Sequence, residues 1–223
     1  MTVTFQPLGD SAIRVGFGDS SNCDDREIEE RIQAFHRAVT KRPLPGVVEC
    51  VPAYTTVAVY YDPLATDYDQ LVVQLKVIAK QAPSRTSKAV RRVNIPTIFG
   101  GEAGPDLASA AESLGLSAGA LVERFTSAIY TVRMIGFLPG FPYLSGLPDE
   151  LALPRLSTPR VTVPAGSVAI AGRQAGIYPL ASPGGWNILG RTSVTLFDPA
   201  ADTPTLLMPG DRVRFVAVGA LRE

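Results

Sequence analysis

The chain has 223 residues, of which 46% are hydrophobic and 19% are charged, and its formal net charge is +0. This balance is typical of a globular protein and excludes a largely disordered chain. The neutral charge gives no electrostatic reason to expect a nucleic-acid partner.

Few residues suited to metal or redox chemistry are present. Cysteine occurs twice, at Cys23 and Cys50, without a CxxC pattern, and His36 is the single histidine, so we expect no metal site. The start of the chain lacks a basic segment followed by an apolar run, and the longest uncharged stretch, residues 174–190, is broken by glycine and proline. We therefore expect a cytoplasmic protein with two reduced thiols and no membrane association.

The first 81 residues alternate between strand-like and helix-like apolar patterns. Strands are predicted over residues 12–17, 46–51 and 55–61, and amphipathic helices over residues 24–41 and 67–81. In the first helix the apolar residues recur at spacings of four, three and four and form one face: Ile28, Ile32, Phe35 and Val39. The order β-α-β-β-α predicts a ferredoxin-like α/β sandwich, whose sheet a further strand from the start of the chain would complete.

A polar, proline-containing segment at residues 82–88 is typical of a linker. After it we predict a strand over residues 90–99 and two short helices, the first with Pro105 at its first position and the second with Ser117 as its N-cap. Short β-type runs separated by Gly/Pro turns then cover residues 131–137, 167–172, 192–197 and 212–218. This pattern favours a β-barrel or a β-sandwich.

Glycine and proline are concentrated in residues 136–191, which hold 9 of the 20 Gly and 8 of the 19 Pro. Turns of a barrel account for only some of them. The same segment contains five aromatic residues and four arginines, and no lysine follows Lys88. Arginine offers a planar fork to a carboxylate or phosphate, and glycine lets backbone N–H groups approach a ligand closely. Apolar walls with a few polar groups are typical of a binding pocket.

Two interpretations of this segment remain open. Either its loops form a binding site, or its aromatic residues belong to the core and its arginines are solvated. On the first interpretation, the candidate residues for binding a substrate or a partner are Phe137, Pro139, Phe141, Tyr143, Arg155, Arg160, Pro164, Gly166, Gln174, Tyr178, Pro183, Gly184, Gly185, Trp186 and Arg191. No catalytic residue is assigned, because the chain has no GxxxxGK[ST] loop, no GxSxG elbow and no second histidine for a nucleophile–base pair.

Six motifs occur in a characteristic order: GDSAIRVGFGD, IPTIFGGEAGPDL, GFLPGFPYLSGLP, TPRVTVPAGSVAIAG, QAGIYPLASPGGWNILGRT and LFDPA. Together they resemble the KipI / 5-oxoprolinase B-subunit family, also labelled allophanate hydrolase subunit 1, over nearly the whole chain. The resemblance implies an N-terminal α/β domain, which we place at residues 1–84, and a C-terminal cyclophilin-like β-barrel domain at residues 85–223. Together with the ferredoxin-like pattern, this gives α+β as the predicted fold class.

The resemblance also implies a function. Members that resemble the B-subunit act with a C-subunit-like protein and a LamB-type A-subunit in the ATP-dependent hydrolysis of 5-oxoproline to glutamate, so ATP is expected in the assembled complex. Two alternatives stay open: a KipI-type regulatory protein that inhibits a sensor histidine kinase, and a carboxyltransferase-type subunit related to that of urea carboxylase. The cyclophilin-like shape does not by itself imply prolyl isomerase activity.

Two positions depart from the family pattern. Phe125 stands where members of the family often have histidine, and Arg191 stands where some have histidine. If the histidine replaced by Phe125 is catalytic, this chain lacks it; if it is a structural helix residue, phenylalanine can fill its space. An arginine at position 191 still suits an anionic ligand.

The residue set and the resemblance together predict a groove that the C-subunit completes. Arg160 and Arg191 are expected to orient a carboxylate or phosphate. Phe141, Tyr143 and Trp186 are expected to form the apolar wall, and the backbone of the PGG run is expected to donate hydrogen bonds.

Overall fold

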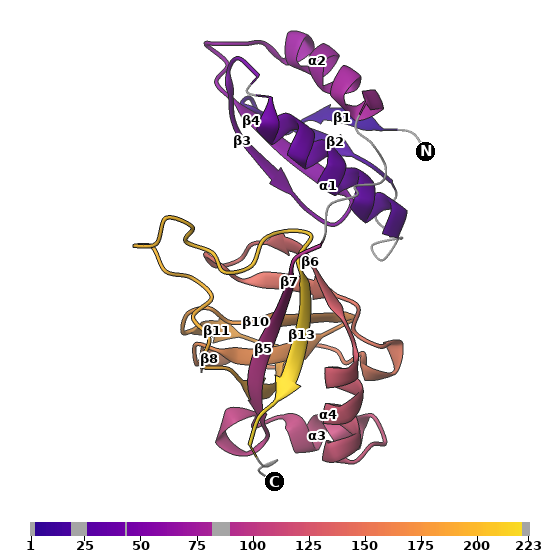
Figure 1. The fold of residues 1–223 in the computed structure, drawn as a ribbon, viewed down its shortest axis with the longest axis vertical. Coiled ribbons are helices and arrows are strands. Elements are labelled where there is room, and N and C mark those ends of the chain that lie inside the picture. The colour runs from indigo at the N-terminus through magenta and orange to yellow at the C-terminus, as the bar shows by residue number, and fades with distance from the viewer. Residues whose placement is uncertain (1–2, 19–25, 43, 82–89, 220–223) are drawn as a thin grey trace. The chain divides into compact units, whose positions relative to one another are not determined.

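Figure 1 shows the computed structural model of the chain, which describes residues 3–18, 26–42, 44–81 and 90–219. The chain divides into two compact units, residues 1–89 and 90–223, each with a hydrophobic core of its own. The predicted linker at residues 82–88, and with it the predicted boundary between residues 84 and 85, lies outside the described residues. In the described part of the chain, no helix combines the length and the apolar character needed to span a membrane.

The first unit is a four-stranded antiparallel sheet with two helices. Its elements are β1 (Thr4–Pro7), β2 (Ala12–Gly16), α1 (Arg26–Lys41), β3 (Val47–Pro52), β4 (Thr56–Tyr61) and α2 (Tyr68–Gln81). The strand order is β1-β2-β4-β3, so β4 lies between the two strands that α1 connects. This split β-α-β arrangement confirms the predicted ferredoxin-like sandwich, and β1 is the further strand from the start of the chain.

Apolar periodicity explains why both helices pack on this sheet. The predicted apolar face of α1 is buried together with one face of α2 and alternate residues of β2 and β4; the shared core includes Ile28, Ile32, Phe35, Val39, Leu71, Leu75, Ile78, Ile13, Val15, Val57 and Val59. His36 of α1 is partly buried, as expected for a helix histidine, and its Nε2 lies 3.1 Å from the carbonyl oxygen of Cys50 in β3.

The second unit contains a closed seven-stranded barrel with the order β10-β7-β6-β13-β5-β12-β9. Its strands are β5 (Arg92–Phe99), β6 (Tyr130–Ile135), β7 (Pro142–Ser145), β9 (Ser167–Ala171), β10 (Gln174–Ile177), β12 (Asn187–Arg191) and β13 (Arg212–Ala217). A separate two-stranded sheet pairs β8 (Arg160–Val163) with β11 (Ser182–Gly184). The predicted fold class, α+β with a C-terminal barrel, is confirmed.

Helical segments accompany the barrel: η2 (Gly101–Ala103), α3 (Leu107–Ser113), α4 (Ala118–Ser127) and η3 (Asp149–Leu151). Phe125 of α4 is fully buried, with its ring centroid 4.8 Å from that of Phe215 and 5.2 Å from that of Tyr130. The hydroxyl of Tyr130 donates a hydrogen bond of 2.9 Å to the carbonyl oxygen of Phe125. Phe125 is therefore a core residue, so the side chain at this position fills space in the barrel interior.

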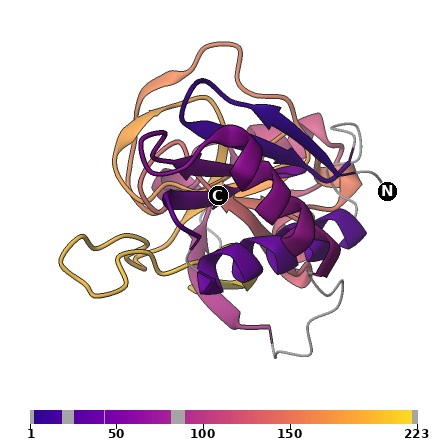
Figure 2. The same ribbon diagram turned by 90° about the horizontal axis from the view of Figure 1, so that it is seen from above.

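One predicted strand is wrong. Residues 192–197 do not form a strand but begin the long loop between β12 and β13, which projects from the barrel in both views (Figures 1 and 2). Their burial alternates as in a strand, but the barrel closes without them and offers no free strand edge for pairing.

Of the two predicted helix starts in this unit, one is wrong and one is confirmed. Pro105 is not the first helical residue, because α3 begins at Leu107 with Asp106 as its N-cap, and the Asp106 carboxylate bonds outside the helix. Ser117 is confirmed as the N-cap of α4, where its side-chain oxygen accepts a hydrogen bond from the backbone N–H of Ala120.

Candidate functional site

Five aromatic residues predicted for the site pack against one another in the second unit. We call them the aromatic cluster: Phe137, Phe141, Tyr143, Tyr178 and Trp186. Phe141 lies at the centre, with its ring centroid 5.0 Å from that of Tyr143, 5.2 Å from that of Tyr178 and 5.6 Å from that of Trp186. All of these pairs are edge-to-face, the geometry that the ring quadrupoles favour.

Most of the aromatic cluster is core. Phe141, Tyr178 and Trp186 are only 1%, 2% and 5% exposed, so this chain buries them without a partner. Gly176 of β10 makes the packing possible, because a Cβ atom there would lie 2.8 Å from the ring of Phe141 and 3.0 Å from the ring of Trp186. The rings therefore pack directly on the backbone of β10 and form a rigid support for the neighbouring loops.

Phe137 is the exposed member of the aromatic cluster. Its side chain is 61% exposed, and its φ of 70° lies in the left-handed region that residues other than glycine rarely adopt. Its ring stands edge-on to the rings of Phe141 and Tyr178, with centroids 5.5 and 6.4 Å away. An exposed aromatic ring held on a strained backbone is a candidate contact for a ligand or a partner.

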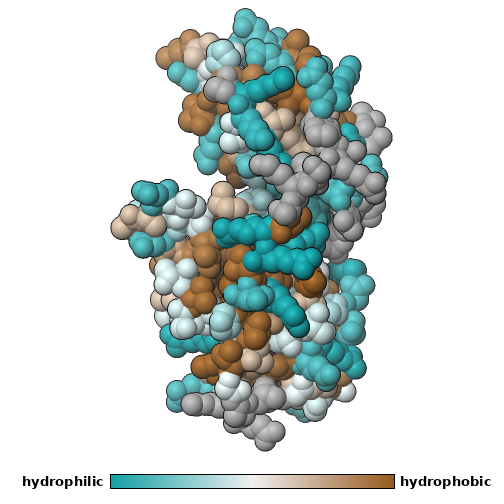
Figure 3. All heavy atoms as spheres, in the orientation of Figure 1, coloured by the Kyte–Doolittle hydropathy of each residue, from teal (hydrophilic) through white to brown (hydrophobic). Residues whose placement is uncertain are grey.

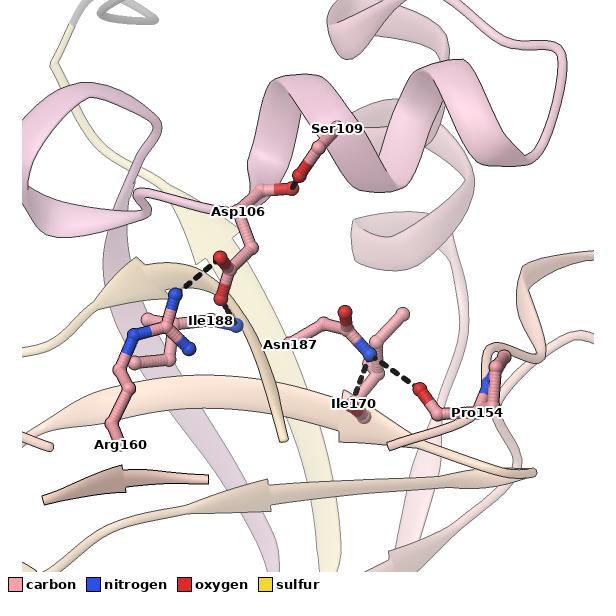
Figure 4. Close-up of polar contacts among 7 residues, drawn as sticks. All are labelled: Asp106, Ser109, Pro154, Arg160, Ile170, Asn187 and Ile188. Carbon is pink, nitrogen blue, oxygen red and sulfur yellow. Dashed lines mark hydrogen bonds and ion pairs between the residues drawn. The ribbon is translucent and has the colours of Figure 1, made fainter. Parts of the chain in front are cut away.

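Arg160, at the start of β8, forms an ion pair with Asp106, the residue that precedes α3 (Figure 4). The second carboxylate oxygen of Asp106 accepts a hydrogen bond of 2.7 Å from the backbone N–H of Ile188 in β12. One terminal nitrogen of Arg160 is buried and has no hydrogen-bond partner among the described residues. The pair thus ties β8, α3 and β12 together and neutralises the charge of Arg160.

Asn187 of β12 fixes the segment that carries Arg155. Its side-chain nitrogen donates to the carbonyl oxygen of Pro154 at 2.9 Å (Figure 4), and Arg155 follows directly with an exposed side chain. Burial raises the pKa of Tyr143 and of Tyr178, and the charge of Arg155 opposes the rise in both. Both phenols therefore stay protonated near neutral pH and can donate hydrogen bonds.

A cleft of about 550 Å³ is lined by η2, by the turn after β8 and by the loop that follows β12. Its polar lining comprises Glu102, Arg191, Thr192, Ser193 and Thr195. The Nε of Arg191 donates to the carbonyl oxygen of Ala165 at 3.1 Å, and no carboxylate in the described residues is ion-paired with its guanidinium. The cleft has the size of a small-molecule site and holds an exposed cation.

Gly166 shapes this cleft. Its φ is +82°, and a Cβ atom at this position would lie 2.1 Å from the carbonyl oxygen of Thr192. Its N–H donates to the carbonyl oxygen of Tyr178 at 2.7 Å, and its own carbonyl accepts from the N–H of Thr192 at 2.9 Å. Through these bonds, Gly166 connects the cleft to the aromatic cluster.

The remaining predicted residues lie around these two features. Pro139 and Pro164 are exposed in or beside turns, and Pro183 is exposed in the middle of β11. Gln174 begins β10, Gly184 pairs with Arg160 in the β8–β11 ladder, and the carbonyl oxygen of Gly185 accepts from the N–H of Leu156. The backbone of the PGG run is thus used within the fold, and its donation of hydrogen bonds to a ligand stays a prediction.

Several polar residues of the site are absent from the sequence-based set: Glu102, Asp106, Thr192, Ser193 and Thr195. An Asp before an apolar helix is an N-cap signal, so Asp106 was recognisable as a helix boundary but not as the partner of Arg160. From Ser193 to Leu196 polar and apolar residues alternate as in a strand, so the pattern predicted a strand instead of a cleft-lining loop. In the described ranges, no three His, Cys, Asp or Glu side chains are grouped as metal ligands.

Comparison with known proteins gives a consistent result. A family model described as the carboxyltransferase domain, subdomain C and D, matches residues 3–207. The chain is 40% identical over 230 residues to the 5-oxoprolinase B-subunit of Bacillus subtilis (strain 168), with 98% of this chain and 95% of the relative covered. It is 46% identical over 176 residues to the 5-oxoprolinase B-subunit of Escherichia coli O157:H7, with 78% and 79% covered.

A solved structure, that of TTHA0988, matches the chain with a TM-score of 0.83 and 40% sequence identity. The match covers 94% of this chain and 40% of that chain. The chain thus spans less than half the length of that solved relative, and the similarity is to one portion of a longer protein.

Proposed function

The chain belongs to the family of carboxyltransferase domains, subdomain C and D, and from this premise we propose that it is the B-subunit of an ATP-dependent 5-oxoprolinase. It acts in the cytoplasm with a C-subunit-like protein and a LamB-type A-subunit to hydrolyse 5-oxoproline to glutamate. The observation that carries the proposal is the 40% identity to a 5-oxoprolinase B-subunit across 98% of this chain. Activity belongs to the assembled enzyme and not to this chain alone.

The cleft beside Arg191 suits a small lactam with one carboxylate, which is the chemistry of 5-oxoproline. Arg191 binds the carboxylate through its guanidinium, a charge-assisted and geometrically specific contact. Ser193 and Thr195 offer hydroxyl groups to the lactam amide. Opening the ring converts the amide nitrogen into an ammonium group, and Glu102 offers that group a carboxylate.

ATP supplies the phosphoryl group that activates the lactam oxygen in this proposal. The cleft does not fit a triphosphate, because Arg191 is the one cation on its described lining and Glu102 adds negative charge. The N–H of Gly166, which would be the natural phosphate donor, is already bonded to the carbonyl of Tyr178. We therefore assign ATP to another component of the enzyme and binding of the lactam to this chain.

The description of the matching family favours one second candidate, a carboxyltransferase-type subunit. Such an enzyme takes its carboxyl group from a biotin carrier. Transfer of carboxyl from a carboxylated biotin carrier in the presence of this chain and its companions would favour this candidate. The KipI-type regulatory function stays a prediction from the sequence resemblance.

The test of the proposed function is ATP-dependent glutamate release from 5-oxoproline by the three subunits expressed together, with the variant Arg191→Ala. Removing a charge-assisted contact to the carboxylate costs about 2 kcal/mol, so kcat/KM falls roughly 30-fold. Arg173→Ala is the matched control, since Arg173 is an exposed arginine paired with Asp149 outside the cleft. Unchanged turnover in the Arg191→Ala complex would contradict the assignment of the site.

A further inference from the structure

The outer face of β5 and β13 is exposed, although these two strands form a parallel ladder. They pair in parallel from Arg92–Arg212 to Thr97–Ala217. Ile95, Val213 and Phe215 point into the barrel core, so the residues that alternate with them point outward. Parallel strands are usually covered on both faces, but in Figure 1 no helix of the second unit lies in front of β5 and β13.

One end of this face is cationic. Arg92, Arg212 and Arg214 line a cleft of about 270 Å³ together with Asn94. Arg92 and Arg212 are register partners, and like charges directly opposite one another destabilise a sheet. No carboxylate in the described parts of the chain is ion-paired with any of these three arginines. An acidic group from another molecule would offset their mutual repulsion.

The neighbouring Arg91, in contrast, is neutralised by a carboxylate of the same chain. Its Nη2 lies 3.2 Å from a carboxylate oxygen of Asp211. Arg212, one residue beyond Asp211, instead donates to the hydroxyl of Thr131, which is neutral. The cationic end is therefore not explained by local ion pairing within the described chain.

The other end of the same face is apolar. Ile98, Val216 and Val218 are 42%, 38% and 40% exposed, and the side chain of Pro96 lies between the arginines and Ile98. Figure 3 shows hydrophobic and hydrophilic atoms adjoining over β5 and β13. An apolar patch beside a charged one has the composition of a protein interface, with a dry centre and a polar rim.

This face also leads to the candidate site. Ile98, at its apolar end, lines the cleft of Arg191 and is the register partner of Arg191 in the β5–β12 ladder. A protein that covers the apolar end therefore borders the cleft as well. This geometry lets a docked partner shield the cleft from bulk water.

We propose that the outer face of β5 and β13 docks a companion subunit whose contact surface is acidic opposite Arg92, Arg212 and Arg214 and apolar opposite Val216 and Val218. The inference rests on the proposed function, which supplies the companion. A second copy of this chain does not fit. A two-fold contact through this face would set the arginines against other arginines or against the apolar end, and would leave them unpaired.

The experiment measures binding of the purified full-length chain to the purified C-subunit-like protein by titration calorimetry at low and high salt. The double variant Arg92→Glu/Arg214→Glu and the single variant Val216→Asp each weaken binding at least about tenfold. Raising the salt concentration weakens binding of the wild type more than that of the double variant. Arg124→Glu, on the exposed side of α4, is the matched control and binds as the wild type does.

Folding of the variants is checked by circular dichroism. Their spectra should match that of the wild type, because the substituted side chains point away from the core. Wild-type affinity in both docking variants overturns the proposal, as does a wild-type chain that does not bind the C-subunit-like protein. If the chain alone forms dimers, and these substitutions dissociate them, the face binds a second copy of the chain and not the C-subunit-like protein. A complex that assembles through this face yet releases no glutamate contradicts the proposed function and leaves the docking inference supported.

Discussion

Arg160 and Arg191 are both candidate site residues of the second unit, but they have different surroundings, which indicate different roles. Arg160 is held by the carboxylate of Asp106, which also accepts the N–H of Ile188. Arg191 uses one nitrogen to hold the carbonyl of Ala165 and leaves its guanidinium exposed at a cleft. We therefore propose a structural role for Arg160 and a ligand-binding role for Arg191.

The structural role of the Asp106–Arg160 pair predicts a loss of stability when it is broken. Asp106→Asn removes the charge that compensates the half-buried guanidinium, so the free energy of unfolding falls by about 1–3 kcal/mol. Asp149→Asn breaks the exposed pair with Arg173 and costs less than about 0.5 kcal/mol. Urea unfolding of the two variants checks this, and equal losses would show that the Asp106 pair is only a surface contact.

A comparison of Gly166→Ala with Gly172→Ala separates the cost of backbone strain from the cost of steric overlap. Both have positive φ, +82° and +56°, but a Cβ at Gly166 would meet the backbone oxygen of Thr192, whereas a Cβ at Gly172 would meet no described atom within 4 Å. Gly172→Ala therefore costs about 1 kcal/mol of strain. Gly166→Ala adds overlap with a fixed backbone and costs about 2 kcal/mol or more. Similar unfolding midpoints for the two variants would contradict this account of the cleft.

At the scale of elements, the sequence pattern was informative where periodicity is long. The apolar spacing in α1 and α2 predicted both helices, because their buried faces repeat over several turns. Residues 192–197 show the opposite case: their alternation is that of a strand, but a strand also needs a neighbour, and the closed barrel provides none. Pairing partners are set by the tertiary fold and are not encoded in a local window.

The contact between α1 and β3 predicts a pH dependence of stability. Burial lowers the pKa of His36, and the hydrogen bond to the Cys50 carbonyl only partly opposes this. The folded chain then binds this proton less readily than the unfolded chain, whose histidine has a pKa of 6.5. The free energy of unfolding therefore falls as the pH drops through that value.

His36→Gln isolates this effect, because His36 is the single histidine and the carboxylates titrate at lower pH. Urea unfolding between pH 7.5 and pH 5.5 should show a decline for the wild type and a flat profile for the variant. A decline of equal slope in the variant would place the pH dependence elsewhere.

For the molecule as a whole, composition located the region of the site and included Arg191, but it missed the other polar residues that line the cleft. The aromatic, arginine and glycine content of residues 136–191 predicted a binding region, and both the aromatic cluster and Arg191 lie in it. Burial of Phe141 and Trp186 could not be predicted, because it depends on the close approach of both rings to Gly176 in β10. The Asp106–Arg160 pair joins residues 54 positions apart, a contact that only the folded barrel creates.

If this chain is a required component of a 5-oxoprolinase, glutamate release depends on its presence, and an omission experiment measures that dependence. ATP-dependent glutamate release from 5-oxoproline is measured with the C-subunit-like protein and the LamB-type A-subunit, with and without this chain. Release is expected only when this chain is present, at a rate that saturates as the chain reaches equimolar amounts. Equal release without the chain, or no release from the complete set of three folded subunits, would contradict it.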